Sequence, residues 1–264
     1  MNLEVAFFCI TRDSDASLTT AVEDNVAKII SVYPETTIIA SQDTCSQTIE
    51  VLRDGGCRVR IQPGRGVGDA RREVLRTALR EKIGHIHLCD LDRALHWANT
   101  YLKELKSLRC LIPKRDLLIL ERTPRAFETH PRPQRVTESI TNQVFSLVIG
   151  RHVDVNAASR GISHRAARIL LEHSRAPGFE TDVEWPLIIK LRSNLNIGYL
   201  EVEGLEYETH LKHRGAIRDA GGIGKWKSLL EKDPEEWLKR VRVAQSMIEA
   251  SIKVHRELTC RRAE

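Results

Sequence analysis

Two aspartates near position 90 are the clearest candidates for chemistry in this sequence. Asp90 and Asp92 directly follow residues 85–89, an apolar run typical of a buried strand. Carboxylates two positions apart point to opposite faces of a strand, but a turn after the strand can bring both to one site. Mg²⁺ and Mn²⁺ prefer such oxygen ligands, and a cation held there can bridge to a diphosphate. The alternative is that Asp90 caps the following helix and Asp92 is solvated.

A glycine-rich turn at residues 64–68 is the second candidate. It follows a strand-like run at residues 58–62 and leads into a strongly helical stretch at residues 69–83. Glycines let a backbone approach a ligand closely, and the amides at a helix start bind anions. The spacing is neither that of a Walker loop nor that of a dinucleotide-binding fingerprint. The turn therefore predicts either an anion-binding loop or a plain strand-to-helix connection.

These candidates fall where strand-like segments end. Four apolar runs alternate with helical stretches, which predicts a parallel sheet covered by helices on both faces. The expected strands are residues 3–11, 36–40, 58–62 and 85–89. Ligands of such sheets bind beyond the carboxyl ends of the strands. Attention therefore goes to residues 11–13, 42–43, 63–69 and 90–92.

The pattern loosens beyond residue 97. Further strands are expected at residues 117–120, 196–202 and 205–207, and helices at 138–149, 163–173, 182–191 and 234–257. Residues 122–135 contain three Pro and four Arg and predict a mobile basic loop. Residues 212–227 are basic and Gly-rich without a clear period. The apolar stripe of the C-terminal helix suits packing on its own domain or a contact between two copies of the chain.

Composition restricts the class of protein. The 264 residues are 41% hydrophobic with a net charge of +5, which excludes disordered, collagen-like and disulfide-scaffold proteins. None of the six cysteines has the C-x-x-C spacing of a zinc or thioredoxin site. No secretory signal and no run of membrane-spanning length is present. We therefore expect a reduced, cytoplasmic protein.

In this order, the features resemble the nucleotide-sugar domain of glycosyltransferases with the GT-A fold. The similarity is to family 2, including polyprenyl-phosphate sugar transferases and soluble glycerate and phosphoglycerate glycosyltransferases. It implies an α/β fold with a mostly parallel central sheet, helices on both faces and a C-terminal helical extension. It further implies a nucleotide-sugar-binding half at residues 1–110, an acceptor-binding half of the same domain at 111–212, and a lid-like loop with the C-terminal helix at 213–264.

The resemblance also implies roles for individual residues. A Mn²⁺ or Mg²⁺ ion would be held by Asp90, Asp92 and His210, with His213 as an alternative ligand. The donor nucleotide would be bound by a polar set near the strand ends: Thr11, Asp13, Asp43, Arg65, Asp69, Arg71 and Asp90.

Two segments of the second half resemble the acceptor side of these enzymes. Residues 154–163 are similar to the stretch that enters an acceptor-side helix, and residues 178–184 to the acidic segment that supplies a carboxylate near the acceptor. Asp182 is the first choice for that carboxylate, followed by Glu180 and Glu184. Such a group can deprotonate an acceptor hydroxyl as it attacks the anomeric carbon with inversion. The alternatives are that these acids cap a helix, or that the reaction retains configuration, as in some soluble relatives.

The predicted function is therefore a metal-dependent glycosyltransferase that moves a sugar from a nucleoside-diphosphate sugar to a hydroxyl or phosphate acceptor. The basic residues 122–135 suit an anionic acceptor. One alternative is a sugar-phosphate nucleotidylyltransferase, although no Gly-rich loop follows the first strand. Another is a non-enzymatic anion- or nucleic-acid-binding protein, although the recognition helix and stacking aromatics of nucleic-acid binders are missing. We expect no nucleic-acid partner, and peripheral membrane contact and a homodimer stay open.

Overall fold

The computed structural model describes residues 5–208 and 211–260. Within them, seven strands form one sheet in the order β3-β2-β1-β4-β6-β5-β7. All neighbouring strands are parallel except the two pairs that involve β6. The strands are β1 (Val5–Thr11), β2 (Thr36–Ala40), β3 (Arg58–Ile61), β4 (His85–Asp90), β5 (Leu117–Arg122), β6 (Ser159–Ser163) and β7 (Ile197–Val202). The mostly parallel sheet that the alternating pattern predicted is thus confirmed.

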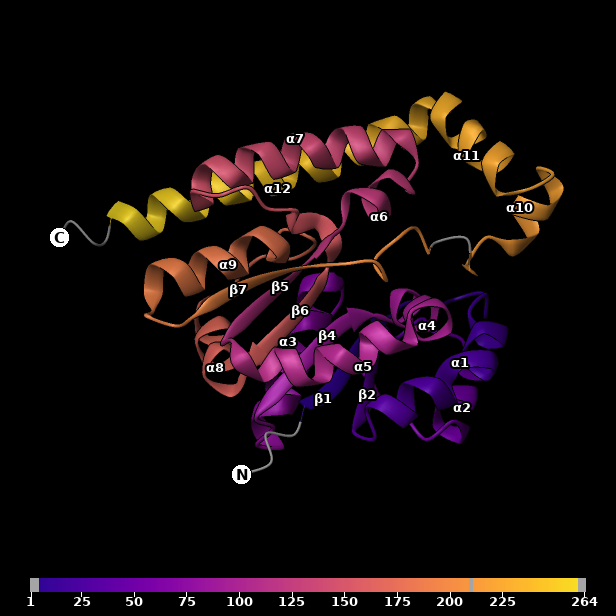
Figure 1. Cartoon of the computed structure of the whole chain (residues 1–264), viewed down its shortest axis with the longest axis horizontal. Helices are drawn as coiled ribbons and strands as arrows, with labels where there is room; N and C mark the ends of the chain where they lie inside the picture. The colour runs from indigo at the N-terminus through magenta and orange to yellow at the C-terminus, as the bar shows by residue number, and fades with distance from the viewer. Residues whose placement is uncertain (1–4, 209–210, 261–264) are drawn as a thin grey trace.

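Helices cover both faces of this sheet (Figure 1). One face carries α1 (Thr19–Val32), α2 (Ser46–Asp54), α4 (Leu91–Thr100) and α5 (Leu102–Leu111). The other carries α3 (Val67–Arg80), α7 (Arg132–Ile149), α8 (His164–His173), α9 (Thr181–Arg192) and α12 (Pro234–Cys260). The remaining helical segments are α6 (Pro124–Glu128), α10 (Arg214–Asp219), α11 (Ile223–Lys232) and two 3-10 turns, η1 (Ile112–Lys114) and η2 (Val155–Ala157).

Each face of the sheet has its own hydrophobic core, because successive side chains of a strand point to opposite faces. In β1, Phe7 belongs to the core beneath α1 and stacks on Tyr33 with ring centroids 4.7 Å apart. The next residue, Phe8, belongs to the other core together with Val74 of α3. Both phenylalanines are fully buried. β1 is therefore fixed from both sides, and its carboxyl end is held in place for whatever binds there.

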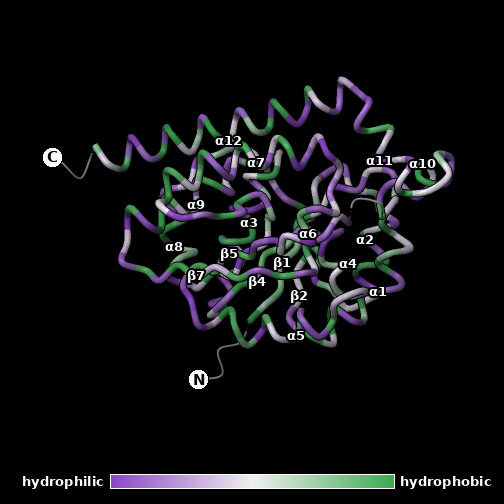
Figure 2. The backbone as a smooth tube through the Cα atoms, turned by 45° about the horizontal axis from the view of Figure 1, so that its top comes forward, coloured by the Kyte–Doolittle hydropathy of each residue, from purple (hydrophilic) through white to green (hydrophobic). Residues whose placement is uncertain are grey.

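The C-terminal helix α12 packs on its own chain. It lies along α7 and contacts α9 (Figure 1). Figure 2 shows hydrophobic and hydrophilic residues alternating along its length, as expected of an amphipathic helix. Met247 and Leu258 are buried in the core on the α3 side of the sheet. Within the described part of the chain, no helix is long and apolar enough to cross a membrane.

Several expectations for the second half are wrong. The expected mobile loop at residues 122–135 is instead the end of β5, helix α6 and the start of α7. The Gly-rich residues 212–227 contain helix α10 and the start of α11 rather than an aperiodic loop. No strand forms at residues 205–207, whereas residues 159–163 form the strand β6, which the sequence pattern did not indicate. These segments depend on tertiary partners, which a local pattern does not reveal.

Candidate functional site

A cavity of about 860 Å³ opens at the edge of the sheet where β1, β2, β3 and β4 end. This is the position at which open α/β sheets bind their ligands. The residues that line it come from these strand ends and from two later segments of the chain. They are Ile10, Thr11, Arg12, Ser41, Gln42, Asp43, Gln62, Gly64, Arg65, Gly66, Val67, Ala70, Asp90, Asp92, Phe179 and Lys212.

The β1 and β2 side of the cavity offers polar groups for a ligand. The Oγ1 atom of Thr11 is buried and has no hydrogen-bond partner among the described residues. Asp43 accepts hydrogen bonds from the Ser41 hydroxyl at 2.6 Å and from Nε of Arg12 at 2.8 Å. The Ser41 bond and the Arg12 charge lower the pKa of Asp43. An ionised carboxylate is therefore available here as an acceptor for a ligand hydroxyl.

The glycine-rich turn forms the next wall. Gly66 has a φ of +88°, a conformation that side chains other than glycine rarely adopt. A Cβ atom at Gly68 would lie 2.3 Å from the carbonyl oxygen of Ala176, so the start of α3 packs directly on the backbone there. Asp69 accepts hydrogen bonds from the backbone N–H of Arg65 and from the Arg72 side chain. Arg65 lines the cavity, whereas Asp69 is not among the lining residues and shapes the turn instead.

Two further residues of the expected donor set lie behind the cavity wall. Asp13 is buried and accepts hydrogen bonds from the Ser17 and Thr48 hydroxyls, which ties the end of β1 to α1 and α2. Arg71 is buried beneath α3, where its Nη1 atom lies 2.9 Å from Oδ1 of Asp182. Neither residue lines the cavity. Their side chains support the site rather than face it.

The first carboxylate of the acidic pair stands at the end of β4. The Asp90 side chain is 27% exposed, and no described residue donates a hydrogen bond to it. Asp90 occupies the N-cap position of α4 but makes no side-chain capping bond, so the capping alternative is not supported. Burial raises the pKa of Asp90, and the negative charge of Asp92 adds to the effect, while Arg71 and Arg93 oppose it. A cation bound nearby would therefore stabilise the ionised form of Asp90.

The second carboxylate already holds a cation. Nζ of Lys212 lies 2.6 Å from Oδ2 of Asp92, and the backbone N–H of Arg93 donates to Oδ1 at 2.9 Å. Although burial opposes ionisation, the Lys212 ammonium lowers the pKa of Asp92. Burial likewise lowers the pKa of Lys212, but the charge of Asp92 raises it more. The two groups form an ion pair on the cavity wall.

The acidic pair supplies some of the ligands that a divalent cation needs, but not a full set. The Lys212 ammonium is a stand-in cation on Asp92, and Asp90 presents oxygens to the same cavity. Within residues 5–208 and 211–260, however, no three His, Cys, Asp or Glu side chains are grouped as a metal site. The expected third ligand, His210, lies outside the described residues. The alternative, His213, packs its ring 5.2 Å from that of Trp226.

The acids expected to act as a base do not line the cavity. Asp182 is only 5% exposed, and its Oδ1 atom contacts both Arg71 at 2.9 Å and Arg160 at 3.2 Å. Glu184 accepts hydrogen bonds from the Ser174 hydroxyl and from the backbone of residues 175 and 176. Glu180 accepts one from the backbone N–H of Gly178. The segment reaches the cavity through Phe179 instead.

Comparisons with known proteins identify the fold. Neither a protein-family model nor a curated protein matches the chain. Among solved structures, it is similar to glucosyl-3-phosphoglycerate synthase from Mycobacterium tuberculosis in complex with Mg²⁺ and uridine diphosphate. That match has 15% identity and a TM-score of 0.53 and covers 76% of this chain and 69% of the other. The complex of that synthase with phosphoglyceric acid matches with 14% identity and a TM-score of 0.53, covering 76% and 70%. The chain has the GT-A fold.

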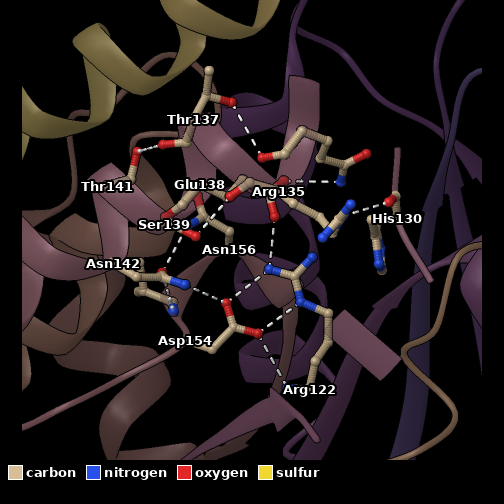
Figure 3. Close-up of polar contacts among 12 residues, drawn as sticks. Arg122, His130, Arg135, Thr137, Glu138, Ser139, Thr141, Asn142, Asp154 and Asn156 are labelled. Atoms are coloured by element: carbon tan, nitrogen blue, oxygen red, sulfur yellow. Dashed lines mark hydrogen bonds and ion pairs between the residues drawn. The ribbon is translucent and has the colours of Figure 1, made fainter. Parts of the chain in front are cut away.

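Outside the cavity, this GT-A fold contains a buried charged cluster that the sequence did not reveal (Figure 3). The Arg122 side chain is fully buried, and its Nε and Nη2 atoms donate to Asp154 at 2.7 Å each. Nη2 also lies 2.6 Å from Oε2 of Glu138. Asn142 donates to Asp154 at 2.8 Å. Arg122 therefore joins β5 to α7 and to the segment before η2.

Buried donors without a partner occur in this cluster and beside the acidic pair. Nη1 of Arg93 and Nη1 of Arg122 are buried without a hydrogen-bond partner among the described residues. Nε2 of His130 also lacks a partner among them, but it is the acceptor nitrogen of the ring, because Nδ1 donates to the carbonyl oxygen of Ala126. Burial and the positive charges of Arg122 and Arg93 hold the pKa of His130 well below its usual range. Nε of Arg93 lies 3.9 Å from Asp90 and 3.5 Å from Glu208, which places Arg93 beside the end of β4. Unpartnered buried donors of this kind favour an anion.

Proposed function

We propose that the protein is a glycosyltransferase that takes a sugar from a nucleoside-diphosphate sugar. The observation that carries the proposal is the cavity of about 860 Å³ at the strand ends, with Asp90, Asp92 and Lys212 on one wall and the glycine-rich turn on another. A volume of this size suits a small-molecule ligand. The GT-A fold supports the same proposal, because the matched synthase was solved with uridine diphosphate.

The donor would bind with its nucleoside toward β1 and β2. In this arrangement, the Thr11 hydroxyl and the Asp43 carboxylate bind the polar groups of the nucleoside. The diphosphate lies along the glycine-rich turn, where Arg65 can form charge-assisted hydrogen bonds to phosphate oxygens. The proposed donor half is then residues 1–110. The acceptor half is residues 111–212, with α10, α11 and α12 following it.

A divalent cation would be held by Asp90 and Asp92. When bound, it supplies positive charge that stabilises the departing diphosphate. Asp90 is suited to hold it because its carboxylate accepts no hydrogen bond from the described residues. His210 remains the proposed third ligand. The matched synthase was solved with Mg²⁺, which supports this choice of cofactor.

The acceptor is proposed to be a small anionic molecule with a free hydroxyl group. The unpartnered donors of Arg93 and Arg122 would bind its phosphate or carboxylate. Arg93 contacts Asp90, so an anion bound there would lie next to the donor site. Phosphoglyceric acid, which is bound in a matched structure, is an acceptor of this class.

Asp182 is proposed to position other groups rather than to act as the general base. A base needs a lone pair that faces the acceptor, and geometry is the first requirement. The Oδ1 atom of Asp182 instead faces the guanidinium groups of Arg71 and Arg160. Arg71 in turn lies close enough to Asp90 to lower its pKa. Asp182 would thus hold the Arg71 guanidinium in place, and the positive charge of Arg71 would stabilise the acidic pair.

Thermal unfolding with ligands tests the proposal. UDP, GDP and ADP are each added with Mn²⁺, with Mg²⁺ or with EDTA. A nucleotide at about 100 times its dissociation constant should stabilise the fold by roughly 2.7 kcal/mol. We expect one nucleotide with metal to give this shift, and Asp90→Asn to abolish it. Asp24→Asn is the matched control, because Asp24 is exposed on α1. If no nucleotide shifts the wild-type melting temperature under any metal condition, the proposed function is wrong.

A further inference from the structure

Among the described residues, Lys212 is the cationic side chain of the second half of the chain that forms an ion pair with the acidic pair. It follows β7 in sequence, yet its ammonium lies 2.6 Å from Asp92 on the wall of the cavity. The Lys212 side chain is 30% exposed, so it faces the cavity rather than the core. The ion pair therefore joins the second half of the chain to the end of β4 at the place where donor and metal are proposed to bind.

A metal ion and the Lys212 ammonium would compete for Oδ2 of Asp92, because both are cations. Mg²⁺ binds carboxylate oxygens at about 2.0–2.1 Å and demands near-ideal octahedral geometry. Oδ2 of Asp92 is taken by Nζ of Lys212, and Oδ1 accepts the backbone N–H of Arg93. A dication at Oδ2 would also stand beside a like charge. Metal binding at Asp92 is therefore expected to weaken the Lys212–Asp92 ion pair and to favour departure of the ammonium.

The departing ammonium has a second anion within the same cavity. Lysine carries its charge on a flexible four-carbon stem and binds phosphate as a point charge. The glycine-rich turn and Arg65 line the same cavity as Lys212. A diphosphate that binds along this turn would offer new acceptor oxygens to Nζ. Lys212 thus has one partner before the ligands bind and another afterwards.

We propose that Lys212 is the resident counter-ion of Asp92, that a divalent cation displaces it, and that it then binds the diphosphate of the donor. This inference rests on the proposed function and adds a positioning residue to it. It has a consequence for how the metal and the nucleotide affect each other's binding. Metal alone must break the ion pair without compensation, whereas metal with diphosphate gives Lys212 a new partner. The two ligands should therefore strengthen each other's binding through Lys212, and the effect must be reciprocal.

Lys212→Gln tests this inference by two binding measurements. Free Mn²⁺ is first titrated by electron paramagnetic resonance in the absence of nucleotide. Lys212→Gln should bind Mn²⁺ about tenfold more tightly than wild type, because no ammonium competes for Asp92. UDP, with GDP and ADP in parallel, is then titrated calorimetrically at saturating Mn²⁺. Here Lys212→Gln should bind the nucleotide about tenfold more weakly, because the diphosphate loses a cation.

Two further variants separate charge from structure. Lys212→Arg keeps the charge, so it should bind Mn²⁺ as weakly as wild type. Lys225→Gln removes an exposed lysine of α11 and should match wild type in both titrations. If Lys212→Gln does not fold, Lys212→Met takes its place.

The inference is overturned if the uncharged variant binds Mn²⁺ no more tightly than wild type, or if its nucleotide affinity is unchanged. A wild-type protein that binds no nucleotide would contradict the proposed function instead. The Mn²⁺ titration would still decide whether Lys212 competes with the metal.

Discussion

Asp154→Ala should destabilise the protein strongly, because it removes a main partner of a buried guanidinium. Asp154 accepts the Nε and Nη2 hydrogen bonds of Arg122 and one further bond from Asn142. Without it, Glu138 is the one anionic partner of Arg122 that remains among the described residues. Breaking a buried ion pair by removing one member costs about 3–5 kcal/mol. A protein of this size typically has about 5–15 kcal/mol of stability, so the loss should be large.

Urea unfolding of a double-mutant cycle measures this effect. Asp154→Ala, Arg122→Met and the double variant are compared with wild type. Each single variant should lose about 3–5 kcal/mol, whereas the double variant should lose much less than their sum, since each single variant already removes the Arg122–Asp154 interaction. Asp154→Ala should also lower the melting temperature by roughly 10 °C. A loss below about 1 kcal/mol, or additive losses, would refute the view that the Arg122–Asp154 pair is buried and compensated as described.

The same pair gives a pH dependence with a defined sign. Although burial raises the pKa of Asp154, the charge and hydrogen bonds of Arg122 lower it more, so the folded value lies below the ordinary one. A lowered folded pKa adds stability above the unfolded value, near pH 3.9, and this contribution is lost as the pH falls below it. Wild type should therefore lose stability below about pH 4 more steeply than Asp154→Ala. Equal slopes would contradict this reasoning.

Two further substitutions test residues that lie behind the cavity wall. Gly68→Ala should destabilise the protein by about 1–3 kcal/mol in urea unfolding, because its Cβ would lie 2.3 Å from the Ala176 carbonyl oxygen. Gly224→Ala is the control, because a Cβ at that position meets nothing within 4 Å. If the proposed function holds, Asp182→Asn should reduce the rate of nucleoside-diphosphate release from the sugar donor, with phosphoglycerate as the proposed acceptor, by less than about tenfold. A loss of about 10²–10⁴-fold would instead support the general base that the sequence suggested.

The first half of the fold could be predicted because its signals are local. Apolar runs such as β1 and β4 are buried on both faces of a parallel sheet, and such strands read as continuous hydrophobic segments. The strand β6 gives no such signal. Its five residues include Arg160 and Gly161, and it is a strand because it pairs with β4 and β5. A Cβ at Gly161 would lie 2.9 Å from the Ile112 side chain. The close packing of Ile112, which is distant in sequence, therefore favours glycine at this position.

Charged residues were wrongly predicted to be solvated where their ion-pair partners are distant in the sequence. Arg122 stands in a Pro- and Arg-rich stretch and looks solvated, yet it is buried because Glu138 and Asp154 compensate its charge. No sequence pattern links these three positions. Arg71 and Asp182 likewise meet only in the folded chain.

The rule that ligands bind beyond the carboxyl ends of parallel strands located the candidate site. It does not say which side chains point into that site. Thr11, Asp43, Arg65, Asp90 and Asp92 line the cavity. Asp13, Asp69 and Arg71, expected in the same set, support its walls from behind instead, through the contacts described above. Which neighbour turns inward depends on hydrogen bonds with α1, α2 and α9, and these partners are far away in the sequence. His210 lies outside the described residues, so its role remains a prediction.

The packing of α12 has a consequence for how the chain folds during synthesis. Domains generally fold as they emerge from the ribosome, amino-terminal parts first. The core on the α3 side, however, includes Met247 and Leu258 of α12 together with residues of β1. That core cannot be completed until the ribosome has translated past Leu258 and α12 has docked along α7 and α9. A nascent chain stalled before α12 would expose the apolar surfaces of both helices and depend on chaperones to stay soluble.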